Sequence, residues 1–302
     1  MDEACVEWPA EHRVDAVTNG GPRIINMPVP VLESVFSRIA YHAVYDASIR
    51  EALEFARDNG FAGVQAALET PHLAMEHVSK EERARICALC AKAGLTLALH
   101  APDDVASLFV SDPHLREGIF GHYGAMLDFA RDTGARILTL HPGAMIRFKT
   151  DTAPVVALPD VDRQLYRSTF EANLKRLAAM AAGTGVAVCV ENYPFDPFAC
   201  EILQPFLDAG ALRLCWDIAK TCRDGGQPNA EEEAFYWGNL AHIHQVHLHD
   251  VRDGRGHCVI GTGAIDFRRF LPRLAAAGVA QFCIEVRPQE KALESLQALR
   301  RL

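Results

Sequence analysis

Four residues with metal-binding side chains stand at or near the ends of short apolar runs in the second half of the chain. These residues are Glu191 in VAVCVEN, Asp217 in LRLCWD, His247 in QVHLHD and Glu285 in FCIEV. Three carboxylates and one imidazole form an oxygen-rich donor set that suits Mn²⁺, Mg²⁺ or Co²⁺ and tolerates Zn²⁺. Carboxylates that converge on one point repel one another unless a cation neutralises them. If the fold gathers these side chains, the sequence predicts one divalent cation; otherwise each residue caps its strand or pairs with a neighbouring base.

The segments that must position these residues alternate in type along the chain. Short apolar runs rich in β-branched residues are each followed by a longer stretch with helical periodicity. A polar residue closes each of eight such runs: His42, Glu69, His100, His141, Glu191, Asp217, His247 and Glu285. These residues are on average about 35 positions apart, which fits a repeat of strand, helix and parallel strand. Near-continuous apolar strands are also typical of a parallel sheet covered by helices.

The chain of 302 residues, of which 49% are hydrophobic, is long enough for two ordinary domains or for one large barrel. A doubly wound sheet would usually have fewer strands, and no G-x-G-x-x-G follows the first strand. We therefore predict a single (β/α)₈ TIM barrel over residues 36–302. Residues 1–35, with several prolines and glycines, are predicted to form an irregular amino-terminal extension. The carboxyl ends of the strands in such a barrel share one mouth, so the strand-end residues should point at a common centre.

The composition argues against several classes of protein. A net charge of −9 without a basic stripe argues against binding to nucleic acid. No apolar window reaches the ~18 residues that a membrane helix needs, and the acidic start MDEACVEWPAEHR does not resemble a signal peptide. Nine scattered cysteines, an odd number, indicate reduced thiols and a cytoplasmic protein. The sequence leaves the oligomeric state open, and a homo-oligomer is compatible with it.

Five motifs at the predicted strand ends carry a resemblance to a known family. They are LHPGA after the fourth strand, VEN at the fifth, CWDIAK at the sixth, HLHD with the following DGRGHCVIGTGAIDF at the seventh, and IEV at the eighth. From about residue 36 to its end, the chain resembles the xylose isomerase-like barrel superfamily, which includes sugar-phosphate isomerases, ketose 3-epimerases, certain dehydratases and the endonuclease IV group. The resemblance implies that Glu191, Asp217, His247 and Glu285 bind one divalent cation. It also implies that Glu191 and Glu285 are the catalytic pair, which lie on opposite faces of the bound sugar and exchange its protons.

The chemistry of the donor set agrees with that implication. A cation chelated by a carbonyl oxygen and the neighbouring hydroxyl lowers the pKa of the intervening C–H and stabilises the enediolate that forms. A carboxylate on each face can then remove and return the proton. We therefore expect a divalent-metal-dependent isomerase or epimerase of a small sugar or its phosphate. The alternatives are a dehydratase of a cyclic polyol or keto acid (of the inosose or dehydroshikimate type), an endonuclease IV-type phosphodiesterase, and a barrel that binds a ligand or partner without catalysis.

The chain departs from the family pattern at two positions. Lys220 stands where epimerases and endonuclease IV usually have a histidine, three residues after Asp217. Arg255 replaces an aspartate that the endonuclease IV branch needs two residues before His257. Cations thus replace two metal ligands of that branch. This argues against a complete trinuclear zinc centre and against phosphodiesterase activity.

A wider set of polar side chains is expected to bind the substrate: His100, His141, Lys220, His249, Arg255, His257 and Arg287. His100, His141 and His257 match the remaining histidines of the endonuclease IV branch, which leaves a second, partial metal site open. Hydrogen bonds to substrate hydroxyls are the favoured interpretation of these three. His249 has the same strand parity as His247, so its side chain is expected to reach the substrate.

The extra cations at the predicted mouth suggest an anionic substrate. Lys220 has three interpretations: an ammonium that binds substrate, an amine that forms a Schiff base, or a solvated loop residue. Arg287 lies two positions after Glu285, so strand alternation places both on the inward side. Together with Arg255 it could hold a carboxylate or a phosphate, which a guanidinium binds well. We therefore expect a small sugar or polyol substrate, with an anionic group as a further hypothesis.

Overall fold

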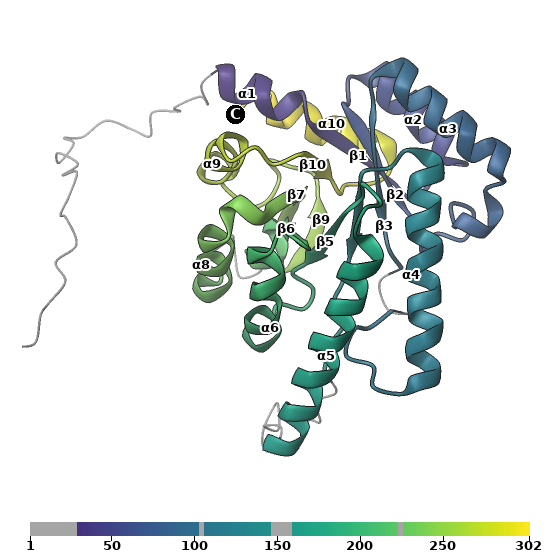
Figure 1. The fold of residues 1–302 in the computed structure, drawn as a ribbon. Coiled ribbons are helices and arrows are strands. Elements are labelled where there is room, and N and C mark those ends of the chain that lie inside the picture. The colour runs from purple at the N-terminus through teal and green to yellow at the C-terminus, as the bar shows by residue number, and fades with distance from the viewer. Residues whose placement is uncertain (1–28, 103–105, 146–158, 223–225) are drawn as a thin grey trace, which may run out of the picture.

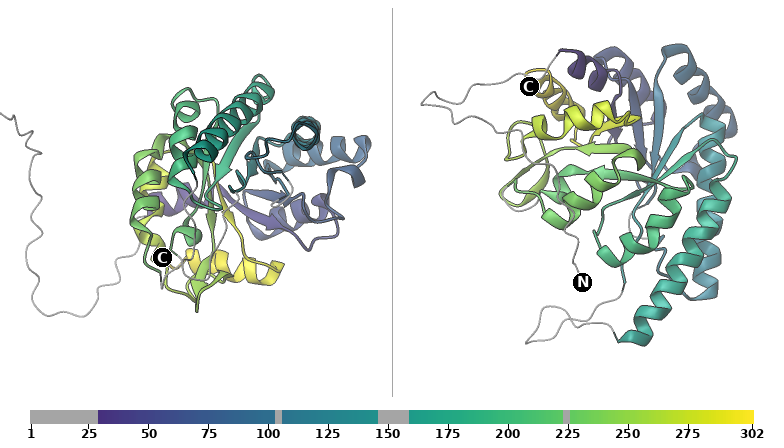
Figure 2. Two further views of the ribbon diagram at one scale, coloured as in Figure 1. Left: turned by 90° about the horizontal axis from the view of Figure 1, so that it is seen from below. Right: turned by 60° about the vertical axis from the view of Figure 1, so that its left-hand side comes forward.

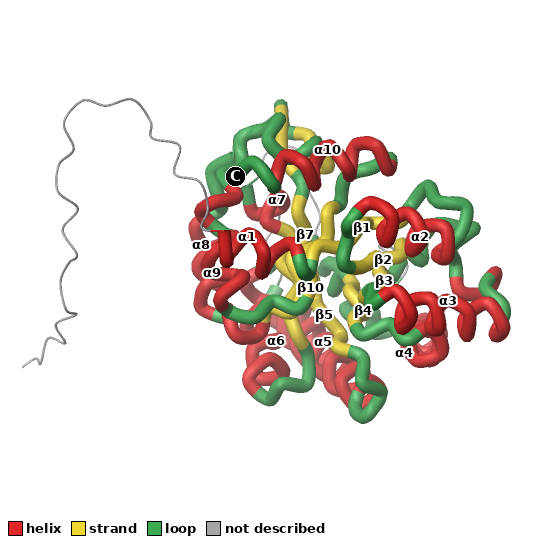
Figure 3. Tube along the Cα trace, turned by 90° about the horizontal axis from the view of Figure 1, so that it is seen from above, coloured by secondary structure: helices red, strands yellow, loops and turns green. Residues whose placement is uncertain are grey.

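The computed structural model describes residues 29–102, 106–145, 159–222 and 226–302. Eight parallel strands close into a barrel in the order β1-β10-β7-β6-β5-β4-β3-β2. Seen from above in Figure 3, the strands occupy the centre and the helices surround them. The predicted single (β/α)₈ barrel is therefore confirmed, and each of the eight apolar runs supplies one barrel strand.

The barrel strands are short and almost fully buried. They are β1 (Ile39–Ala43), β2 (Gly63–Ala67), β3 (Thr96–His100), β4 (Ile137–Leu140), β5 (Ala187–Glu191), β6 (Arg213–Asp217), β7 (Ile243–Leu248) and β10 (Gln281–Ile284). Every neighbouring pair is parallel, so all carboxyl ends open at the same mouth. An antiparallel hairpin of β8 (Asp250–Arg252) and β9 (Arg255–Cys258) follows β7. The sequence pattern did not predict this hairpin.

The helices cover the outside of the barrel. They are α1 (Val29–Phe36), α2 (Ile49–Asn59), α3 (Lys80–Ala93), α4 (Pro113–Thr133), α5 (Asp160–Ala181), α6 (Pro197–Asp208), α7 (Ile218–Thr221), α8 (Ala230–Gly238), α9 (Leu271–Ala276) and α10 (Gln289–Leu299), with 3₁₀ turns at Met75–His77, Leu240–His242 and Phe267–Arg269. Figures 1 and 2 show that α5 starts well beyond the ends of the strands, so its first turns project past the body of the barrel. In the described part of the chain, no helix combines the length and the apolar character needed to cross a membrane.

Local caps explain why the helices begin and end where they do. The Ser48 side chain accepts a hydrogen bond from Glu51 N at 3.1 Å and so caps the start of α2. Gly60, Gly94 and Gly134 follow α2, α3 and α4 in the left-handed conformation, with φ between 67° and 78°. Glycine adopts this conformation without steric cost. These three glycines therefore end α2, α3 and α4.

The predicted boundary of the irregular extension at residue 35 is wrong. Residues 29–36 form α1, whose Val35 side chain is buried. Pro30 suggested irregular chain, but it lies in the first turn of the helix, where the missing N–H breaks no helical hydrogen bond. Directly after the helix, Arg38 donates hydrogen bonds to the carbonyl oxygens of Ala275 and Val279, which ties this segment to α9. Residues 1–28 of the predicted extension lie outside the described residues.

Polar side chains cross the inside of the barrel below the mouth. Gln245 Nε2 donates to Gln281 Oε1 at 2.7 Å, and Gln281 Nε2 donates to Thr96 Oγ1 at 3.2 Å. The Thr139 hydroxyl also donates to the side-chain oxygen of Gln245. Buried polar groups are stable when they are hydrogen-bonded in this way. The chain of bonds connects β3, β4, β7 and β10 and forms a polar floor under the strand ends.

Candidate active site at the mouth of the barrel

The carboxyl ends of the strands gather the four predicted metal ligands. Glu191 and Asp217 are the last residues of β5 and β6, His247 lies near the end of β7, and Glu285 directly follows β10. The strand register places Asp217 beside His247 on neighbouring strands. All four residues are buried, with at most 3% of their surface exposed. The mouth therefore concentrates three carboxyl groups in a region with little access to water.

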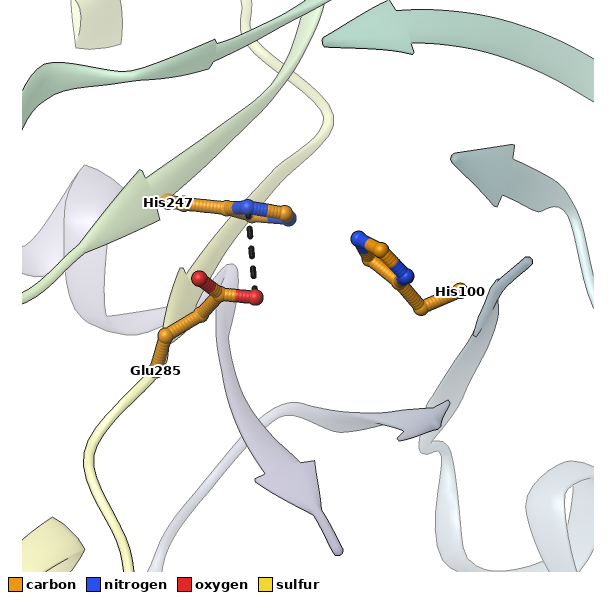
Figure 4. Close-up of side chains that lie close together, drawn as sticks. All are labelled: His100, His247 and Glu285. Atoms are coloured by element: carbon orange, nitrogen blue, oxygen red, sulfur yellow. Dashed lines mark ion pairs between the residues drawn. The ribbon is translucent and has the colours of Figure 1, made fainter. Parts of the chain in front are cut away.

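His247 lies between the two glutamates. Its Nδ1 is 3.3 Å from Glu191 Oε2 and 3.3 Å from Glu285 Oε1. Figure 4 shows the contact between His247 and Glu285 on the left and the ring of His100, which faces them from the right. Both ring nitrogens of His247 are buried, and neither has a hydrogen-bond partner among the described residues. A buried imidazole that faces two carboxylates without a hydrogen bond has the donor chemistry of a metal ligand.

Lys220 lies between Glu191 and Asp217. Its Nζ contacts Glu191 Oε1 and is 3.4 Å from Asp217 Oδ2. The ammonium also lies 4.6 Å from the ring centre of Tyr193. The side chain is only 15% exposed, which rules out a solvated loop residue. Burial favours the neutral amine, but the Glu191 and Asp217 carboxylates raise the pKa of Lys220, which argues against the Schiff-base interpretation.

Two histidines contact Glu191 from the side of β3 and β4. His100 Nε2 is 3.2 Å and His141 Nε2 is 3.4 Å from Glu191 Oε2. These three residues form one of the described clusters whose potential ligand atoms all lie within 4.8 Å of one another; His100, His247 and Glu285 form another. The predicted positions of His100 and His141 at the mouth agree with this arrangement.

Neighbouring basic side chains hold the pKa of both glutamates low. Burial alone would raise the pKa of each carboxyl group. Lys220 and His247 outweigh that effect and hold the pKa of Glu191 well below its ordinary value, and His247 acts in the same way on Glu285. Burial disfavours the charged form of His100, but its hydrogen bond with Glu191 raises the pKa of the imidazole to about 10. At neutral pH the two glutamates are therefore carboxylates that can accept a proton.

The donor set fits a divalent cation. Glu191 and Glu285 offer carboxylate oxygens on either side of the His247 imidazole, whose buried nitrogens lack hydrogen-bond partners in the described chain. Asp217 belongs to none of the described clusters of potential ligands, and its carboxylate instead contacts Lys220 Nζ at 3.4 Å and His249 Nε2 at 3.2 Å. Carboxylate oxygens with one imidazole are ligands that Mn²⁺, Mg²⁺, Co²⁺ and Zn²⁺ accept.

His249 and His257 form a stacked pair beside Asp217. His249 Nε2 is 3.2 Å from Asp217 Oδ2, and the centres of the two rings are 4.2 Å apart. The backbone N–H of His257 donates to His249 Nδ1 at 2.8 Å, and His257 Nδ1 is 3.0 Å from the carbonyl oxygen of Glu285. The β8–β9 hairpin thus folds back and brings His257 to the mouth, where the sequence prediction requires it.

The two predicted arginines lie in different surroundings. Arg255 is exposed at the start of β9, where it pairs in register with Arg252. Arg287 is partly buried two residues after Glu285, and its Nε has no hydrogen-bond partner among the described residues. Whether the two arginines hold one anion together stays a prediction.

Two further residues at the mouth were not among the predicted site residues. His42, in β1, has its Nδ1 3.6 Å from Glu285 Oε1. The exposed Tyr193 places its ring 4.7 Å from that of His141 and beside the Lys220 ammonium. His42 could have been found, because it closes the first apolar run as the other site residues close theirs. Tyr193 lies in the loop after VEN and carries no comparable signal.

Comparison with known protein families assigns the chain to one of them. A family model described as a xylose isomerase-like TIM barrel matches residues 53–302, which is most of the chain. The chain belongs to this family. The resemblance drawn from the strand-end motifs is thereby confirmed. Comparison with curated proteins found no match.

Several solved structures share the xylose isomerase-like fold. A D-tagatose 3-epimerase-like protein aligns with a TM-score of 0.66 and 17% identity over 87% of this chain and 96% of its own. The 3-keto-D-glucoside 4-epimerase of E. coli gives a TM-score of 0.66 and 17% identity over 88% and 99% of the two chains. The IolI protein with a bound zinc atom gives 0.64 and 14% over 88% and 99%. At these identities the similarity establishes the fold.

Proposed function

We propose that this xylose isomerase-like barrel is a divalent-metal-dependent isomerase or epimerase of a small sugar or polyol. The observation that carries the proposal is the pair of buried, ionised carboxylates, Glu191 and Glu285, on either side of His247. Proton exchange at a carbon next to a carbonyl group uses one group that removes the proton and one that returns it. The D-tagatose 3-epimerase-like protein and the 3-keto-D-glucoside 4-epimerase, both of this fold, support this class of reaction.

The proposed cofactor is one divalent metal ion. Glu191, Asp217, His247 and Glu285 would hold it, and Mn²⁺, Mg²⁺ or Co²⁺ suits this oxygen-rich set better than Zn²⁺. When bound, the ion supplies positive charge that stabilises an anionic form of the substrate. The zinc atom in the structure of the IolI protein supports metal binding by a barrel of this fold.

Other side chains of the mouth are proposed to orient the substrate. His100 contacts Glu191 Oε2 and so fixes the orientation of that carboxylate. The Lys220 ammonium is held beside the ring of Tyr193 and can donate to a substrate oxygen. The exposed face of Tyr193 offers an apolar surface for the C–H groups of a sugar. Glu191 and Glu285 then accept and return the proton at the reacting carbon.

A dehydratase of a cyclic polyol or keto acid is the second candidate. The structure favours it at one residue: the raised pKa of His100 keeps a protonated imidazole beside Glu191, and a leaving hydroxide needs a proton donor. Both reactions begin with removal of a proton next to a carbonyl group, so the same glutamates would serve both. Loss of water creates an enone that absorbs ultraviolet light, whereas epimerisation does not.

Exchange of protons for deuterium tests the proposal. The full-length protein is incubated in D₂O with Mn²⁺ and a panel of ketoses, polyol ketones and their phosphates, and exchange is followed by NMR. We expect deuterium to enter at the carbon next to the carbonyl group. Glu191→Gln and Glu285→Gln should each lower the rate about 100- to 10,000-fold, because glutamine cannot accept the proton. Glu201→Gln, at an exposed position on α6, is the matched control and should keep the wild-type rate.

Two measurements separate proton transfer from metal binding. Mn²⁺ affinity is measured by electron paramagnetic resonance for each variant, so that a lost cation is not mistaken for a lost base. Exchange is then compared at saturating Mn²⁺. Absence of exchange over the whole panel with Mn²⁺, Mg²⁺, Co²⁺ and Zn²⁺ would refute the proposed reaction. Undiminished exchange in both glutamine variants would refute the assignment of the two glutamates.

A further inference from the structure

The three cations that the sequence places at the mouth differ in their partners. Lys220 is neutralised by Glu191 and Asp217, both within ion-pair distance of its Nζ. Arg255 is exposed on β9 and is therefore well solvated. Arg287 differs from both, because its Nε is buried and donates to no acceptor among the described residues. Of the three charges, that of Arg287 is the one left available to a ligand.

Two other partly buried arginines, Arg38 and Arg83, donate hydrogen bonds to acceptors within the chain. Arg38 donates to the carbonyl oxygens of Val279 and Ala275. Arg83 donates to the carbonyl oxygen of Val78 and pairs with a carboxylate of α4. In the described part of the chain, Arg287 alone among the arginines has a buried guanidinium nitrogen without an acceptor. A buried charged donor without an acceptor is costly, so this position points to a ligand that supplies one.

His42 is a second donor at the same edge of the mouth. β1 and β10 are neighbours in the barrel, and Tyr41 pairs with Ile284 in their register. The nitrogens of His42 are buried, and neither has a hydrogen-bond partner among the described residues. An imidazole offers at least one N–H in either protonation state. The edge formed by β1 and β10 therefore holds donors from His42 and Arg287.

The position of Arg287 in the fold agrees with this description. Arg287 follows β10, which pairs with β1 in the barrel, and it lies two positions after Glu285, whose Oε1 is 3.6 Å from His42 Nδ1. The Glu285 carboxylate does not by itself neutralise the charge of Arg287, because its Oε1 already contacts His247 at 3.3 Å and His42 at 3.6 Å.

We propose that Arg287 and His42 bind an anionic group of the substrate, either a carboxylate or a phosphate. A guanidinium binds both groups through parallel hydrogen bonds. The inference rests on the proposed isomerase or epimerase function and narrows its substrate to a keto acid or a sugar phosphate. Arg287 follows β10, which is three positions from β5 in the closed ring of strands, so a substrate held at Arg287 extends across the mouth toward Glu191.

Three substrates with one carbon skeleton test the proposal. D-fructose is neutral, D-fructose 6-phosphate carries its anion far from the ketone, and 2-keto-D-gluconate carries it next to the ketone. Each has an exchangeable proton at C3, so deuterium exchange gives kcat/KM for all three with the Mn²⁺-loaded protein. We expect one anionic compound to exceed D-fructose by about 10- to 100-fold. If the exchange panel shows that the protein prefers a ketose with fewer or more carbons, three compounds of that length, matched in the same way, replace these.

Variants assign the preference to Arg287. Arg287→Met should abolish the advantage of the anionic compound, so that the ratio of its kcat/KM to that of the neutral ketose falls to about 1. Arg287→Lys, which keeps the charge but loses the planar donor geometry, should retain part of the advantage. Arg252→Met, exposed on β8 near the mouth, is the matched control. A preference that survives Arg287→Met, that Arg255→Met removes instead, or that favours the neutral ketose overturns the proposal.

A binding measurement keeps this inference separate from the proposed reaction. Inorganic phosphate and D-glycerate are titrated into wild-type protein and Arg287→Met, and both proteins are first checked for native circular dichroism. We expect at least one probe to bind the wild type and to bind Arg287→Met about 10-fold more weakly or worse. If a probe binds Arg287→Met more weakly but no substrate exchanges deuterium, the proposed reaction is rejected and the proposed anion site is retained. Equal binding to both proteins, or binding to neither, would reject the anion site.

Discussion

Replacement of Glu232 by alanine tests whether α8 holds one side of the candidate site in place. Glu232 is 5% exposed, and its Oε1 accepts hydrogen bonds from Asn192 Nδ2 at 2.5 Å and Thr221 Oγ1 at 3.0 Å. Asn192 in turn contacts the backbone of Asp217 twice: it donates to the carbonyl oxygen at 2.9 Å and accepts from the N–H at 2.8 Å. The buried carboxylate thus stabilises the ends of β5 and β6 together.

The magnitude follows from the two donors that Glu232→Ala leaves without their acceptor. A buried unsatisfied donor costs about 1–3 kcal/mol. Both donors have alternative acceptors, which are Thr221 Oγ1 at 3.3 Å for Asn192 Nδ2 and the carbonyl oxygen of Asp217 at 3.5 Å for the Thr221 hydroxyl, and these recover part of the loss. We therefore expect the free energy of unfolding to fall by about 2–4 kcal/mol, a large part of typical protein stability. Glu232→Gln keeps one carbonyl oxygen and should lose about 1 kcal/mol.

Urea unfolding followed by tryptophan fluorescence measures this loss near the site itself. Trp216 is fully buried, and its Nε1 donates to Thr221 Oγ1 at 2.8 Å, so its emission reports on this network. Mn²⁺ affinity, measured by electron paramagnetic resonance without urea, should fall about 10-fold in Glu232→Ala because Asp217 loses its fixed orientation. The exposed neighbour on α8 supplies the control Glu231→Ala, which should change neither quantity.

Two outcomes would refute this reasoning. A loss of stability no larger than that of Glu231→Ala would mean that the hydrogen bonds of Glu232 contribute nothing net. Reduced stability with unchanged Mn²⁺ affinity would mean that Glu232 supports the scaffold but does not position Asp217. Partial recovery of Mn²⁺ affinity in Glu232→Gln is the result that only a positioning residue predicts.

Two further predictions concern the scaffold. A Cβ on Gly63 would lie 2.5 Å from the Thr96 carbonyl oxygen, so Gly63→Ala should lose about 1–3 kcal/mol of stability in urea, whereas Gly121→Ala, with nothing within 4 Å, should not. Burial raises the pKa of Asp46, whose carboxylate also accepts from the Tyr41 hydroxyl at 2.9 Å. The folded protein therefore favours the protonated form, and this contribution to stability, present below the ordinary pKa, is lost as pH rises through the raised pKa. Relative to Asp46→Asn, the wild type should be more stable at pH 4 than at pH 7, and a difference independent of pH contradicts the prediction.

The barrel could be predicted from the sequence because its determinants are local and repeated. Each strand is an apolar run of a few residues, and each following segment has helical periodicity and often a terminal glycine. The rule that parallel strands end at one mouth then gathers the strand-end residues without any knowledge of long-range contacts. Glu191, His247 and Glu285 come together for this reason, and so does His100.

What the sequence could not supply is the partner of each side chain. The pairing of Lys220 with Glu191 depends on the short helix α7, whose first turn sets the direction of the lysine side chain. Pro30 suggested irregular structure, because proline disrupts a helix anywhere except in its first turn. The sequence did not show that α1 begins directly before this proline. The β8–β9 hairpin depends on Asp253 and Gly254, whose positive φ values turn the chain back over the mouth. The Asp-Gly pair favours a hairpin turn, but the flanking strands of three and four residues are too short to show an alternating pattern.

The same distinction explains why the predicted anion-binding cations had to be sorted by structure. Lys220 follows Asp217 by three residues and Arg287 follows Glu285 by two, so their positions in the sequence are nearly equivalent. In the fold, Lys220 has two carboxylates within reach of its Nζ, whereas the buried Nε of Arg287 has no acceptor in the described chain. A cation already paired with carboxylates would have to break those contacts to hold a substrate anion, but an unpaired one would not. Of the three cations considered as binding sites for an anionic substrate, we therefore retain Arg287, at the edge of the mouth between β1 and β10.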